Sequence, residues 1–189
     1  MDLTEARQLA SRLAAPLGIE RVRIEEALGR VAAQSVVADR NLPGECRSRL
    51  DGFALRSDDI RGAAPGRPVS LRILTGCLAA GHTVDVGIGS KECIRILTGA
   101  PFPPSADAVA AQEDVTVRGD ELVLERACDR GNGVALPGEE VKEGDSLLAE
   151  GEVLTPTRLA VMVALGYESM AVYRQPRVAL LATGDEVKA

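Results

Sequence analysis

The stretch SRLDGFALRSDD, residues 48–59, places an acid and a glycine inside a largely apolar run. It lies early in a segment, residues 41–138, in which glycines and prolines punctuate short β-like runs. Asp-Gly is a common turn dipeptide, because both residues tolerate a positive φ. The carboxylate of Asp51 could equally be an acid at the edge of a cleft, where it would hold Mg²⁺ or contact a ligand. The pattern alone leaves both interpretations open.

Short β-like runs continue after this stretch. They are RPVSLRIL (67–74), KECIRILTG (91–99), DAVAAQEDVTV (107–117) and ELVLER (121–126). The alternating residues VTVRGDELVL predict a hairpin that turns at Gly119. Strands that recur roughly every 8–12 residues are typical of a small barrel or sandwich. We therefore expect a β-rich, barrel-like domain here.

Helix signals lie on both sides of that segment. Residues 2–18 predict a helix that begins with a capping box of Asp2 and Glu5 and stops at its final glycine. A second helix is predicted from an N-cap at Thr155, with proline at its first position, to a stop at Gly166.

The unbroken apolar run RVALLATGDEV, residues 177–187, is typical of a buried parallel strand in an α/β domain. Because the chain ends soon afterwards, we expect only the start of that domain. The predicted class is α+β and multi-domain. Residues 1–40 and 139–175 form a discontinuous mixed α+β domain, residues 41–138 an inserted β-rich barrel-like domain, and residues 176–189 the first strand of a truncated α/β domain.

The composition argues against several classes of function. Only two Phe and two Tyr occur among 189 residues, and the net charge is −6. Stacking platforms for nucleic acid and general binding of a phosphate backbone are therefore not expected. No segment approaches the roughly 18 apolar residues of a membrane span, and no signal peptide is visible. We therefore expect no nucleic-acid or membrane partner. Four cysteines without a CxxC pair predict reduced thiols in a cytoplasmic protein.

Three further stretches could carry chemistry. In residues 95–109 a strand ends at Thr98 and Gly99, whose hydroxyl and backbone amides could bind an oxyanion, although a proline-rich loop could use them internally. In residues 180–187 two acids follow the apolar run, where they could serve a helix dipole or hold Mg²⁺. The glutamates of residues 136–145 could be a solvated pair or a binding loop.

Taken in order, four motifs resemble the MoeA/gephyrin family of molybdopterin molybdenumtransferases. The family's serine, two variable positions and Asp-Gly-Tyr/Phe-Ala match residues 48–54, and its R-I-hydrophobic-T-G-A-P-hydrophobic-P matches residues 95–103. Its ADAV and QED match residues 106–109 and 112–114, and its P-R-V-A-hydrophobic-hydrophobic-x-T-G-D-E matches residues 176–186. The resemblance covers almost the whole chain, but only about the N-terminal half of the family's length.

This resemblance implies transfer of molybdenum from molybdate into adenylylated molybdopterin, with release of AMP, in molybdenum cofactor biosynthesis. It also implies Mg²⁺, a homodimer with a site between two subunits, a pterin substrate bound by the α/β domain, and other enzymes of the same biosynthesis as partners. The implied catalytic residues are Asp51, Thr98 and Glu186, and the two acids would hold Mg²⁺ or molybdate. The implied substrate-binding residues are Ser48, Gly52, Gly99, Glu140, Thr183, Gly184 and Asp185.

Departures from the family pattern suggest an alternative. Arg49 stands where many members have a small residue, and the family's Asp-Asn ahead of the serine has become Cys-Arg. The loop that the family writes R-R-x-G-E-D reads ALPGEE at residues 135–140, so two basic residues are absent and Glu140 replaces an aspartate. The alternative is a non-catalytic dimerisation or ligand-sensing module of MoeA-like descent. If the chain is part of the enzyme, we expect it to be inactive alone, without its pterin-binding domain. We also expect residues 2–17 to be disordered, poorly anchored or packed elsewhere.

Overall fold

The structure, a computed structural model, describes residues 2–81 and 85–179. The chain forms two compact units. The inserted unit is Asp39–Gly144, and the flanking unit runs up to Ala38 and resumes at Asp145. The described part is rich in sheet and contains two α-helices, in agreement with the expected α+β class. None of its helices is long and apolar enough to cross a membrane.

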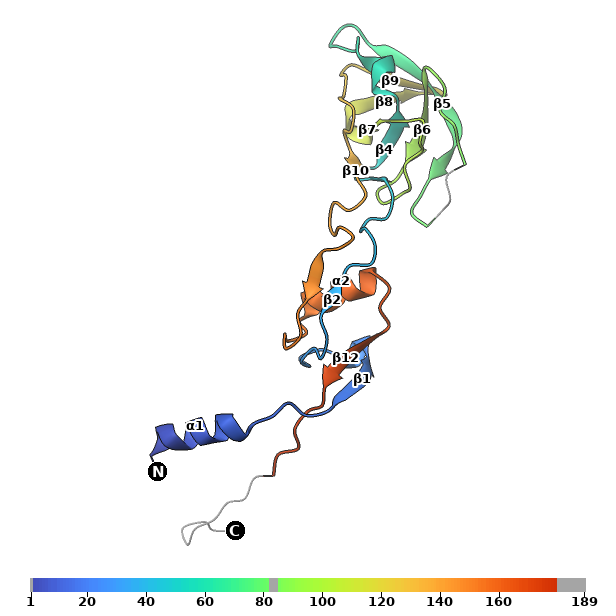
Figure 1. The fold of residues 1–189 in the computed structure, drawn as a ribbon. Helices are drawn as coiled ribbons and strands as arrows, with labels where there is room; N and C mark the ends of the chain where they lie inside the picture. Colours follow the sequence, from blue (N-terminus) through green and yellow to red (C-terminus); the bar gives the residue numbers. More distant parts are fainter. Residues whose placement is uncertain (1, 82–84, 180–189) are drawn as a thin grey trace, which may run out of the picture. The chain divides into compact units, whose positions relative to one another are not determined.

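A curled six-stranded sheet forms the body of the inserted unit (Figure 1). The strands of this unit are β3 (Arg47–Ser48), β4 (Gly52–Leu55), β5 (Val69–Leu78), β6 (Glu92–Ile96), β7 (Ala108–Ala111), β8 (Val115–Arg118), β9 (Glu121–Leu124) and β10 (Val134–Ala135), with 3₁₀ turns η2 (Ser57–Ile60) and η3 (Gln112–Asp114). The sheet order is β7–β4–β6–β5–β9–β8, antiparallel except between β5 and β6. The short strands β3 and β10 pair separately. The hairpin predicted at Gly119 is confirmed, with β8 and β9 paired up to Arg118 and Glu121.

Strand alternation gives this sheet two buried faces. Leu55 and Cys93 are opposite each other and belong to one hydrophobic cluster. Their neighbours Ala54 and Ile94 are also paired and belong to a second cluster. Successive side chains of a strand point to opposite faces, so the centre of the sheet is apolar on both sides. This double burial explains the continuous apolar sequence of β4 and β7.

The flanking unit combines short strand pairs with two helices. Its elements are α1 (Leu3–Leu13), β1 (Ile19–Arg23), η1 (Ile24–Glu26), β2 (Val36–Val37), β11 (Ser146–Leu148), α2 (Pro156–Ala164) and β12 (Ser169–Tyr173). Strand β1 pairs with β12, and β2 pairs with β11. Helix α2 buries Met162 in a cluster that includes Leu148, Leu154 and Val172. Its predicted N-cap is confirmed, because the Thr155 side chain accepts the backbone N–H of Arg158.

Helix α1 begins as predicted but ends early. The Glu5 N–H donates to Asp2 Oδ1 at 2.7 Å and the Asp2 N–H donates to Glu5 Oε2 at 2.9 Å, which completes the capping box. The helix ends at Leu13, so the expected stop at Gly18 was wrong. Pro16 explains the difference, because proline has no N–H to donate and disfavours helical backbone in the residue before it.

The expected weak anchoring of α1 agrees with the structure, while the expected disorder does not. Residues 3–13 form a capped helix, and none of its side chains is buried. The run predicted as a buried strand, residues 177–187, is described only for residues 177–179. These are exposed and in no regular element, with Val178 76% exposed, so the expected burial is not found there.

Candidate functional site

Two motifs meet at the paired ends of β4 and β6. Asp51 immediately precedes β4, and Thr98 lies two residues after β6. Thr98 donates both its backbone N–H, at 2.7 Å, and its hydroxyl, at 2.8 Å, to Asp51 Oδ1. Within the described residues, Asp51 Oδ2 accepts no hydrogen bond. Asp51 therefore shapes the local backbone through one carboxylate oxygen and leaves the other available.

The surroundings of Asp51 keep its carboxylate ionised. The backbone N–H of Thr98, then its hydroxyl, and to a lesser extent the nearby Arg95 guanidinium, hold the pKa of Asp51 below its usual value. A carboxylate that is charged at neutral pH is suited to holding a cation and poorly suited to donating a proton. Sequence reasoning did not single out Arg95, although a lone arginine between the apolar residues of β6 was a visible signal.

The donor chemistry fits a partial Mg²⁺ site. Mg²⁺ commonly keeps several waters and takes only one or two carboxylates from the protein, and Asp51 Oδ2 could be one of these. No group of three or more His, Cys, Asp or Glu side chains that could hold a metal occurs in the described ranges. Asp51 therefore offers one ligand and would need others.

The proposed oxyanion site at the strand end is not formed by the two backbone amides. The Thr98 N–H is bonded to Asp51, and the Gly99 N–H donates to the carbonyl of Ser48 at 2.8 Å. Both amides are occupied within the inserted unit, so for these two groups the structure favours internal use by the loop, one of the two alternatives that the sequence left open. The Thr98 hydroxyl oxygen can still accept a hydrogen bond from a ligand while its proton is held by Asp51.

Ser48 and Gly52 support the Asp51 turn from inside. Ser48 is buried, and its hydroxyl donates to the carbonyl of Leu50 at 2.7 Å. Gly52 is also buried, and a Cβ added to it would lie 2.1 Å from the Ala110 carbonyl oxygen of β7. Both residues therefore support the turn in the structure, whereas the family resemblance implied that they contact substrate.

The remaining predicted residues lie apart from this contact or outside the described residues. Glu140 is exposed on the loop that follows β10, and its N–H donates to the Leu42 carbonyl at 3.0 Å. The structure does not bring Glu140 into the Asp51–Thr98 contact. Four predicted residues lie outside the described residues: Thr183, Gly184, Asp185 and Glu186.

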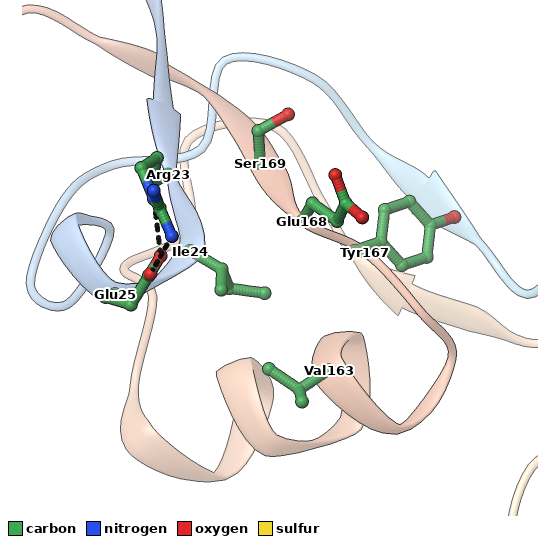
Figure 2. Close-up of a pocket in the computed structure, with 7 residues that line it drawn as sticks. All are labelled: Arg23, Ile24, Glu25, Val163, Tyr167, Glu168 and Ser169. Carbon is green, nitrogen blue, oxygen red and sulfur yellow. Dashed lines mark hydrogen bonds and ion pairs between the residues drawn. The ribbon is translucent and has the colours of Figure 1, made fainter.

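Each unit also contains a cavity that Asp51 does not line. One, of about 540 Å³, is in the flanking unit between β1, α2 and β12, with the Arg23–Glu25 ion pair on its wall (Figure 2). The other, of about 530 Å³, is in the inserted unit, where Asp107 accepts the N–H of Ser57 at 2.6 Å and its hydroxyl at 3.1 Å. Neither cavity contains a residue predicted to act on substrate.

Comparison with known proteins identifies the family of the chain. Residues 1–166 match the family model described as the MoeA N-terminal region, domains I and II. A molybdopterin molybdenumtransferase of Staphylococcus aureus strain Mu50 is 35% identical over 166 residues, which cover 88% of this chain and 39% of the relative. The Haemophilus influenzae enzyme of the same name is 33% identical over 189 residues, 99% of this chain and 45% of the relative.

A solved structure gives the same result. The molybdopterin biosynthesis MoeA protein of Pyrococcus horikoshii aligns with a TM-score of 0.77 and 32% identity, over 93% of this chain and 45% of that protein. The chain spans less than half the length of these relatives. From the matching model and the relatives together, the chain belongs to the family of the MoeA N-terminal region.

Proposed function

We propose that this chain is part of a molybdopterin molybdenumtransferase, which inserts molybdate into adenylylated molybdopterin and releases AMP in molybdenum cofactor biosynthesis. The observation that carries the proposal is the contact between Asp51 and Thr98, which joins two of the matched motifs at one point. The names of the relatives, molybdopterin molybdenumtransferase, support the same activity.

Each residue of the site has a proposed role. Asp51 and Glu186 would hold Mg²⁺, which when bound would supply positive charge against the phosphates of the adenylylated substrate. Thr98 orients the Asp51 carboxylate and keeps it ionised. Ser48 and Gly52 support the Asp51 turn. The proposed substrate contacts come from Gly99, Glu140, Thr183, Gly184 and Asp185.

The wider assignments belong to the same proposal. The working protein would be a cytoplasmic homodimer with the site completed between two subunits, and it would meet other enzymes of molybdenum cofactor biosynthesis. Residues 1–40 with 139–175 would be one domain, residues 41–138 an inserted domain, and residues 176–189 the start of the pterin-binding domain.

A non-catalytic dimerisation or ligand-sensing module is the second candidate. The loop at residues 135–140 favours it, because Ala135 and Leu136 stand where the family pattern has two arginines and Glu140 stands where it has an aspartate. The occupied amides of Thr98 and Gly99 favour it as well, since they leave no backbone oxyanion site at that strand end.

A hybrid enzyme separates the two candidates. Residues 1–166 of this chain replace the matching region of the Staphylococcus aureus relative, and AMP release and molybdenum incorporation are measured with Mg²⁺, molybdate and adenylylated molybdopterin. We expect turnover that falls roughly tenfold or more in Asp51→Asn. The matched control, Asp120→Asn in the exposed β8–β9 turn, should keep the rate. Full activity in Asp51→Asn would remove its catalytic role, and a folded but inactive hybrid would favour the non-catalytic module.

A further inference from the structure

Arg49, which the proposed function leaves without a role, bonds to the segment around β10 at three points. Its backbone N–H donates to the Gly133 carbonyl at 2.9 Å. Its guanidinium donates from Nε to the Val134 carbonyl at 3.2 Å and from Nη2 to the Glu139 carboxylate, with which it forms an ion pair. The planar guanidinium fork therefore spans the strand and the loop that follows it.

Glu139 links Arg49 to the backbone of the loop. Its other oxygen, Oε2, accepts the Leu136 N–H at 3.1 Å, and its own N–H donates to the Leu136 carbonyl at 3.2 Å. These bonds close a four-residue turn with Pro137 second and Gly138 third, at φ +72°. Proline followed by a residue of positive φ is the signature of a type II turn. Arg49 thus holds the residue that closes the turn.

The opposite side of the loop is held by the chain entering the inserted unit. The Gly138 N–H donates to the Pro43 carbonyl at 3.0 Å, and the Glu140 N–H donates to the Leu42 carbonyl at 3.0 Å. A Cβ on Gly138 would lie 2.8 Å from Asn41 Oδ1, so the turn sits closely against that segment. On its other side, the loop is held by the Arg49 side chain, which belongs to the segment that carries Asp51.

The ion pair between Arg49 and Glu139 is expected to fix the conformation of the loop more than to stabilise the folded unit. The Arg49 and Glu139 side chains are 51% and 36% exposed, and exposed pairs contribute little to the free energy of unfolding. The planar guanidinium nevertheless requires its two acceptors, the Val134 carbonyl and the Glu139 carboxylate, to lie in a defined geometry. It can therefore select one loop conformation without adding much to the stability of the unit.

We propose that Arg49 is a positioning residue that fixes the loop of residues 136–140 against the Asp51 segment, so that the Glu140 carboxylate is presented to substrate. The inference rests on the proposed function only in giving Glu140 a substrate contact. A carboxylate there accepts hydrogen bonds from the N–H and O–H groups that a pterin carries. The attachment of the loop itself can be tested without turnover.

The first test measures amide hydrogen exchange by NMR on the 189-residue chain. Arg49→Met and Glu139→Gln should each speed exchange of the Leu136 amide by roughly tenfold, with the Thr98 amide unchanged. The double variant should be about as fast as Arg49→Met, because that substitution already removes the link to Glu139 together with the bond to the Val134 carbonyl. Unchanged exchange at Leu136 in Arg49→Met, or equal acceleration at Thr98, would overturn the proposal.

The second test uses the hybrid enzyme. Arg49→Met should raise the KM for adenylylated molybdopterin about tenfold and change kcat by less than about twofold, with Arg49→Lys in between. Arg61→Met removes a comparable exposed ion pair, with Asp58 at 2.7 Å, and should change neither constant. A loss confined to kcat, or no loss, would overturn the positioning role. If the unsubstituted hybrid shows no turnover, the proposed function fails, and the exchange test still decides whether Arg49 fixes the loop.

Discussion

The inserted and flanking units differ in how completely their elements are buried. In the inserted unit, six strands share one sheet with a buried cluster on each face. In the described part of the flanking unit, the sheets contain two strands each, and one buried cluster gathers around α2. Asp51 and Thr98 lie on the inserted unit, where neighbouring strands on both sides fix the ends of β4. A carboxylate needs such a rigid frame if its position is to matter for binding.

The two helices of the flanking unit also differ in how much of them is buried. Both begin with a side-chain cap, but α2 buries Met162 whereas α1 buries no side chain. Capping and propensity decide whether a helix can form, and packing of an apolar face supplies most of its stability in a protein. Similar substitutions in the two units should therefore change the free energy of unfolding by very different amounts.

The largest loss of stability is expected from Gly52→Val in the inserted unit. The new Cβ would meet the Ala110 carbonyl oxygen at 2.1 Å, and that oxygen belongs to the backbone of the adjacent strand. We expect a loss of more than about 4 kcal/mol in the free energy of unfolding. Denaturant unfolding followed by NMR measures it. Gly62→Ala, where nothing lies within 4 Å of the added Cβ, is the control. A mild effect of Gly52→Val would mean that β4 and β7 are not so closely paired.

A smaller loss in the free energy of unfolding is expected when a side chain is removed from the buried cluster around α2. Met162→Ala removes a fully buried side chain and should cost about 3 kcal/mol. Val163→Ala, at the neighbouring and 55% exposed position of α2, should stay within about 0.5 kcal/mol. Thermal unfolding monitored at flanking-unit resonances compares them. Equal effects of the two substitutions would show that the cluster does not hold α2.

Local signals predicted the helix caps and the hairpin, whereas the contacts of the site depend on residues that are distant in sequence. The caps at Asp2 and Thr155 and the hairpin at Gly119 depend on neighbours in sequence, so their patterns were sufficient. The end of α1 was misplaced for a local reason as well, because Pro16 stops the helix before the glycine at residue 18 is reached.

The site shows the limit more clearly. The family resemblance assigned Asp51 and Thr98 to one catalytic site, but nothing near Gly52 in sequence reveals Ala110 on the adjacent strand. The partner of Arg49 is Glu139, 90 residues away. The Gly99 amide looked available because its acceptor, the Ser48 carbonyl, comes from another strand. Which polar groups are occupied is a property of tertiary contacts, which pattern and propensity do not contain.

An electrostatic effect confined to the inserted unit is expected from Thr98→Val. The substitution removes the hydroxyl bond to Asp51 and keeps the backbone one, so the pKa of Asp51 should rise part of the way to its usual value. Because that pKa is lowered by folding, the stabilisation linked to it is present at neutral pH and is lost as the pH falls through the folded-state pKa. The Thr98→Val variant should therefore lose less of its free energy of unfolding on acidification than the unsubstituted chain does. Carboxyl ¹³C titration by NMR measures the shift, with exposed Thr116→Val as the control.

Arg95→Gln tests the remaining part of the same effect. It should raise the pKa of Asp51 by less than Thr98→Val does, since the guanidinium acts only through its charge and ranks below both Thr98 bonds. Added salt should weaken the Arg95 contribution more than the Thr98 one. A larger shift from Arg95→Gln than from Thr98→Val would mean that charge, and not hydrogen bonding, sets the ionisation of this acid.

The smallest effect on unfolding should come from the cap of α1. Asp2→Ala and Thr155→Ala remove the same kind of interaction, each of about 1 kcal/mol to its helix. In α2 the loss should lower the unfolding midpoint of the flanking unit, because Met162 ties that helix to the cluster. In α1 it should reduce helical circular dichroism and leave the midpoint unchanged, because no α1 side chain is buried. If Asp2→Ala lowers the midpoint as far as Thr155→Ala, α1 packs on the unit in solution, and capping alone does not explain why it is ordered.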